Sequence, residues 1–96
     1  MTLEEFKQSL SHSSPPSGLD VPLQALWLDA KGNWDDAHEL VQHLSTTAAC
    51  WVHAFLHREE GDLGNASYWY SRAGKSKSDR TLQEEWDDIA QELLSA

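Results

Sequence analysis

Residues 61–74 read GDLGNASYWYSRAG, and they carry the pattern of a complete helix with both of its ends. Asp62 follows a glycine and is one of the residues preferred for capping the N-terminus of a helix. After it, apolar and small residues recur at the three- and four-residue spacing of one helix face, until Gly74 ends the pattern. These residues are Leu63, Ala66, Trp69, Tyr70 and Ala73. The stretch therefore predicts an amphipathic helix that packs through one side.

The same pattern occurs once earlier in the chain, at a constant offset of 29 residues. Gly32 corresponds to Gly61, and a further apolar stripe lies upstream of each glycine. Each unit therefore predicts two helices joined by a glycine turn. Ala37 and Ala66 occupy equivalent places, where a small side chain lets the two helices of a hairpin approach closely. The sequence thus predicts two helical hairpins.

Hydrophobic periodicity extends this prediction to the rest of the chain. We expect helices over about residues 20–31, 33–44, 48–60, 62–73 and 81–94. No segment alternates with the two-residue period of a strand. The predicted fold class is all-α, with antiparallel helical hairpins stacked as a short array and the last helix as a C-terminal cap.

Residues 1–18 are expected to lie outside this domain. The first ten favour a short amphipathic helix, and residues 11–18, SHSSPPSG, have the composition of an extended linker. We expect residues 19–96 to form the helical repeat domain and to fold without the first 18. One end of the array then lacks a cover. Either the N-terminal helix folds back on it, or a second copy covers it in a symmetric homodimer.

The stretch from Gly61 to Gly74 resembles the second helix of a Sel1-like or tetratricopeptide hairpin. Asp62, Ala66, the Trp69–Tyr70 pair and Ala73 carry this resemblance. It implies a non-catalytic scaffold that presents a surface to a protein partner. The first helix of each hairpin often lines the concave surface of such an array. The ligand-facing residues expected from this are Gln24, Leu28, Lys31, His53, His57 and Glu60, with Tyr68 outside the core stripe as a further contact.

A second interpretation concerns metal binding. Cys50, His53 and His57 share one helix face with C-x2-H-x3-H spacing, and Glu60 lies beside them. A thiolate and two imidazoles are competent zinc ligands, which would make the protein a His-rich metal-binding helical protein with hydrolysis as one outcome. The alternative is that these side chains form an ordinary second packing face. His38 and His43 do not join them by sequence alone.

Composition narrows the classes of partner. The 96 residues carry a net charge of −9, which repels nucleic acid phosphates and anionic lipid headgroups. One cysteine excludes an intramolecular disulfide, and the first residues lack the pattern of a signal peptide, so we expect a cytoplasmic protein. The sequence contains neither a phosphate-binding loop nor a nucleophile elbow. These observations favour a binding protein over an enzyme, with no resident cofactor unless zinc is bound.

Overall fold

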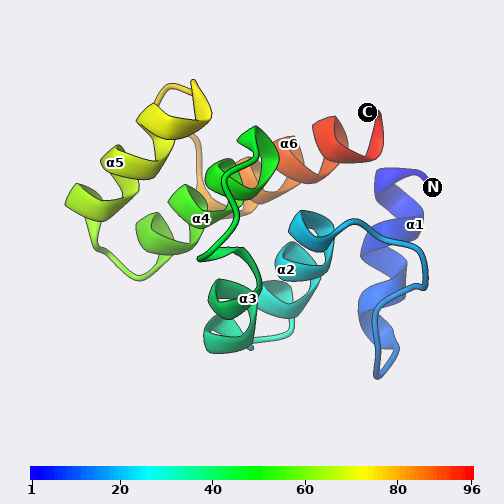
Figure 1. Cartoon of the computed structure of the whole chain (residues 1–96). Helices are drawn as coiled ribbons and strands as arrows, with labels where there is room; N and C mark the ends of the chain where they lie inside the picture. Colours follow the sequence, from blue (N-terminus) through cyan, green and yellow to red (C-terminus); the bar gives the residue numbers. More distant parts are fainter.

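The computed structural model describes all 96 residues and contains α-helices, one 3-10 turn and loops (Figure 1). In chain order the elements are α1 (Leu3–Gln8), the 3-10 turn (Ser9–Ser11), α2 (Val21–Ala30), α3 (Trp34–Val41), α4 (Thr47–Glu59), α5 (Leu63–Ala73) and α6 (Leu82–Leu94). α2 and α3 form one hairpin, α4 and α5 form the second, and α6 packs on α2 and α4. The predicted all-α fold with stacked hairpins and a closing C-terminal helix is confirmed. None of the helices has the length and apolar run needed to cross a bilayer.

The two hairpins turn in the same way. Gly32 and Gly61 have φ values of +87° and +88°, in the left-handed region that favours glycine. In both turns the amide after the glycine donates a hydrogen bond of 2.9 Å to a carbonyl five residues back. The two units that are related by 29 residues in the sequence therefore also have the same turn geometry.

The helix ends agree with the predicted caps at Asp62 and Thr81, and three other ends differ from the prediction. Asp62 accepts from the Asn65 amide as predicted, and Thr81 forms a capping box with Glu84. Asp20 makes no side-chain hydrogen bond at the start of α2, where Pro22 is already in the first turn. The third element, α3, ends at Val41 instead of residue 44. α4 begins at Thr47 because Thr46 caps it through the Ala49 amide.

The core is centred on α4, whose residues from Ala49 to Leu56 are all buried. This helix contacts α2, α3, α5 and α6. Ala37 and Ala66 are fully buried, as expected for close contacts within hairpins. Leu63 differs from expectation, because it lies in the first turn of α5 and is 52% exposed.

Substituting leucine for Ala66 is expected to destabilise the domain by about 1–3 kcal/mol, because the added atoms have no space against α4. The neighbouring Ser67 is exposed, so Ser67→Leu adds similar bulk to the same helix at little cost. Urea denaturation followed by circular dichroism measures both variants. Equal shifts in midpoint would mean that the Ala66 contact is not tight.

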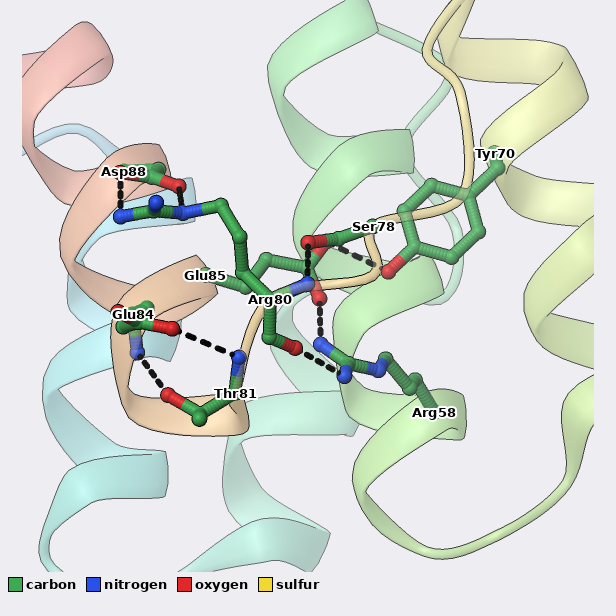
Figure 2. A network of polar contacts seen from close by, with 8 residues as sticks. All are labelled: Arg58, Tyr70, Ser78, Arg80, Thr81, Glu84, Glu85 and Asp88. Atoms are coloured by element: carbon green, nitrogen blue, oxygen red, sulfur yellow. Dashed lines mark hydrogen bonds and ion pairs between the residues drawn. The ribbon is translucent and has the colours of Figure 1, made fainter.

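A polar network anchors α6 and the loop before it to the second hairpin (Figure 2). The Arg58 guanidinium donates to Glu85 at 2.7 Å and also to the main-chain carbonyl of Arg80. The Tyr70 hydroxyl donates to the other Glu85 oxygen at 2.6 Å. Burial, and then the hydrogen bond to Glu85, raises the pKa of Tyr70 far above its usual range. A single buried carboxylate on α6 therefore joins side chains from α4 and α5.

The N-terminal helix is part of the same core. Phe6 is fully buried, and its ring stacks on Trp86 of α6 with 5.6 Å between centroids. The Trp27 indole of α2 donates to the Ser9 hydroxyl at 3.1 Å. The open end of the array was expected to be covered either by the N-terminal helix or by a second copy of the chain. In the structure the N-terminal helix lies there. Whether residues 19–96 fold alone stays a prediction.

Candidate functional site

Burial divides the seven residues expected to face a ligand. His53 and His57 are inside the molecule, with 3% and 7% of their surface exposed. Gln24 and Leu28 are half-buried, whereas Lys31, Glu60 and Tyr68 are exposed. The two histidines therefore belong to an interior cluster, and of the remaining five Glu60 contacts His57.

The interior cluster consists of three histidines from two helices. His53 and His57 are one turn apart on α4, and His38 reaches them from α3. The Nε2 atoms of His38 and His53 are 3.1 Å apart. Each histidine contributes one ring nitrogen to a set of three nitrogens that all lie within 4.8 Å of one another. We call these three residues the histidine cluster.

Two tryptophans fix the orientation of the rings. Trp34 stacks on His38 with 4.9 Å between centroids and an interplanar angle of 9°. Trp69 stacks on His53 at 3.9 Å and 20°. Trp34 is itself held by a hydrogen bond of 2.8 Å from its indole nitrogen to the Leu56 carbonyl. The histidine cluster is thus enclosed by aromatic rings from α3 and α5.

Glu60 fixes the third ring. Its carboxylate lies 2.6 Å from Nδ1 of His57. Because a carboxylate only accepts hydrogen bonds, Nδ1 carries a proton, and Nε2 is the ring nitrogen left to bind a metal ion. His57 therefore offers Nε2 on the side away from Glu60.

The environment favours the neutral form of the His53 and His38 rings. Burial, followed by the neighbouring His38 and His57, lowers the pKa of His53 to about 4. Burial is also the largest cause that lowers the pKa of His38. Neutral imidazole is the form that binds metal ions.

Cys50 does not belong to this cluster. Its side chain is buried on α4, but its sulfur is not among the ligand atoms that converge. His38 takes the third place instead, contrary to the expectation that it does not join His53 and His57. Helix periodicity relates His38 only to residues of its own helix, whereas its neighbours in the cluster come from α4. The contact depends on how the first hairpin stacks on the second.

A second feature is the face on which α1 lies. Besides the Phe6–Trp86 stack, the Lys7 amino group pairs with Asp87 of α6 at 3.2 Å. After α1, the chain is held to α2 by Lys31, whose amino group donates to the Leu10 carbonyl at 2.7 Å. One short helix is therefore bound through an aromatic contact at its centre and polar contacts at its edges.

A crevice of about 520 Å³ lies beside α1 and is lined by residues of α1, α2, α4 and α6. Its walls include the apolar Phe55 and Trp86 and the carboxyl groups of Asp29 and Glu59. Burial raises the pKa of Asp29, and partial burial together with Asp29 raises that of Glu59. A cationic side chain entering this crevice would favour the ionised form of both carboxyls.

No protein-family model, curated protein or solved structure matches the chain. The function is therefore inferred from the contacts just described.

Proposed function

We propose that the protein is a non-catalytic protein–protein interaction module of the tetratricopeptide-like or Sel1-like type. It works in the cytoplasm, where its single buried cysteine stays reduced. It binds a helical segment of its partner on the face formed by α2, α4 and α6. The observation that carries this proposal is α1 itself, a short amphipathic helix that contacts α6 through Phe6 and Lys7.

The contacts of α1 indicate what a partner helix needs. A bulky apolar side chain replaces Phe6 against Trp86, and a basic side chain replaces Lys7 opposite Asp87. The crevice adds two further carboxyl groups, and the whole chain carries a charge of −9. The favoured partner is therefore a basic amphipathic helix, which electrostatic attraction also guides to the surface. A second copy is a related candidate, because two chains that exchange α1 would make the same contacts.

The experiment uses a labelled peptide of residues 1–12 and two full-length proteins. In the Phe6→Ala protein the internal helix binds weakly, so we expect the peptide to bind and its fluorescence anisotropy to rise. In the wild-type protein the internal α1 competes, and binding at the same concentration is expected to be at least about tenfold weaker. A peptide carrying Phe6→Ala is the matched control and is expected not to bind either protein.

Sedimentation equilibrium near 0.15 M salt then separates the two kinds of partner, because this salt concentration screens the repulsion between acidic chains. A concentration-dependent dimer that the peptide dissociates would show exchange of α1 between copies. A monomer that binds the peptide would favour a foreign helix. If the Phe6→Ala protein binds no peptide at any concentration, the face is not a helix-binding surface and the proposal is wrong.

A further inference from the structure

The histidine cluster has the dimensions of a metal site. Two nitrogens that each lie about 2.0–2.1 Å from a tetrahedral Zn²⁺ are about 3.3–3.4 Å apart. The His38 and His53 Nε2 atoms are already 3.1 Å apart, and the third ring nitrogen is within 4.8 Å of both. A shift of a few tenths of an ångström at the first pair, and a closer approach of His57, would complete a three-nitrogen set.

We propose that His38, His53 and His57 bind one Zn²⁺ ion through their Nε2 atoms. Solvent would supply the fourth ligand, because His38 is only half-buried. The ion would connect α3 of the first hairpin with α4 of the second, so it would hold together the stack that forms the domain.

The surroundings of the rings support a ligand role independently of the distances. Metal-bound histidines usually donate their other ring N–H to a carboxylate or carbonyl, which sets the tautomer and the ring orientation. Glu60 provides such a carboxylate for His57 at 2.6 Å. The stacked Trp34 and Trp69 hold the other two rings in place.

Packing alone does not account for the cluster. Nδ1 of His53 is buried without a hydrogen-bond partner, and its Nε2 meets only another imidazole. A buried polar atom left without a partner lowers stability, whereas an apolar side chain of similar size would not. The His53 ring is therefore costly as a core residue. Zn²⁺ would bind at Nε2, the atom that now meets only His38, and Nδ1 would keep its present surroundings.

A second set of candidate ligands shares His57. Ligand atoms of Glu60 and Asp62 lie within 4.8 Å of a His57 ring nitrogen, and Glu60 contacts Nδ1. Asp62 is exposed and already accepts two hydrogen bonds from Asn65 as the cap of α5. Asp62→Asn retains the capping ability but removes the charge, so it separates this set from the histidine cluster.

The test uses the full chain, purified without an affinity tag and treated with a chelator. Calorimetric titration with Zn²⁺ is expected to show one equivalent bound. Co²⁺ in place of Zn²⁺ is expected to give the strong visible absorption of a tetrahedral ion. Free Zn²⁺ at about a hundred times Kd is expected to raise the melting temperature by about 10 °C or more.

Substitutions distinguish this site from surface binding. His38→Ala, at a half-exposed position, is expected to weaken Zn²⁺ binding by more than about 100-fold, and Glu60→Gln by about tenfold. His43→Ala and Asp62→Asn are matched controls outside the histidine cluster and are expected to leave the affinity unchanged. The inference is overturned if the wild-type protein binds no Zn²⁺, if His38→Ala binds as tightly as wild type, or if a control variant weakens binding as much as His38→Ala.

Discussion

Replacing Glu85 by alanine is expected to lower the free energy of unfolding by about 3 kcal/mol or more. The Glu85 side chain is 3% exposed and pairs with Arg58, which is 18% exposed. Without the carboxylate, a mostly buried guanidinium has no counter-charge and the Tyr70 hydroxyl loses its acceptor. Because α6 and the Arg80 carbonyl are attached through the same network, the whole C-terminal helix is weakened. Chemical denaturation followed by circular dichroism gives the change.

Asp88→Ala is the matched control on the same helix. Asp88 pairs with Arg80 at 2.7 Å, but both side chains are about half exposed. An exposed ion pair contributes less than about 1 kcal/mol, so the control is expected to have a small effect. Replacing both partners, as in Arg58→Met with Glu85→Leu, is expected to recover much of the lost stability, since no charge is then left buried. Equal losses for Glu85→Ala and Asp88→Ala would contradict the assigned role of the network.

Features that depend on a few neighbouring residues could be predicted from the sequence. The capping box of Thr81 with Glu84 and the glycine turns at Gly32 and Gly61 involve contacts over three to five residues. The apolar stripes then identify which face of each helix is buried. These local signals were sufficient to predict the helices and their pairing into hairpins.

The contacts between the two hairpins, and those with the N-terminal helix, could not be predicted from such local signals. Phe6 and Trp86 lie near opposite ends of the chain, and nothing near Phe6 in the sequence indicates its partner. Similarly, His38 meets His53 only because of the angle at which one hairpin stacks on the next. A single sequence contains no direct measure of that angle.

The acidic residues of α6 illustrate the same limit. Glu84, Glu85, Asp87 and Asp88 form one run in the sequence. In the structure Glu84 caps the helix, Asp87 and Asp88 make surface pairs, and Glu85 is buried. Only the packing of α6 on α4, together with the contacts of Glu85 to Arg58 and Tyr70, distinguishes the buried carboxylate from its neighbours.

Phe55→Ala is expected to lower the free energy of unfolding by about 3–5 kcal/mol, and Phe6→Ala by clearly less. Both rings are almost completely buried, at 1% and 0% exposure. Phe55 lies in the middle of α4, so the cavity cannot close unless the core itself moves. Phe6 lies on a helix of six residues that a Ser/Pro segment joins to the rest of the domain. When its contact weakens, α1 can detach, so the loss cannot exceed the free energy that holds α1 in place.

Hydrogen exchange distinguishes the two responses. In the Phe6→Ala protein, amides of residues 3–11 are expected to exchange faster while those of α4 keep their protection. In the Phe55→Ala protein, protection is expected to fall throughout the domain. This pattern would also support the prediction that residues 19–96 fold alone, because it requires the domain to stay folded while α1 is released. If Phe6→Ala instead lowers protection in α4 and α6 as strongly as Phe55→Ala does, α1 is an obligatory part of the core. The face beneath it could then not become free for a partner helix.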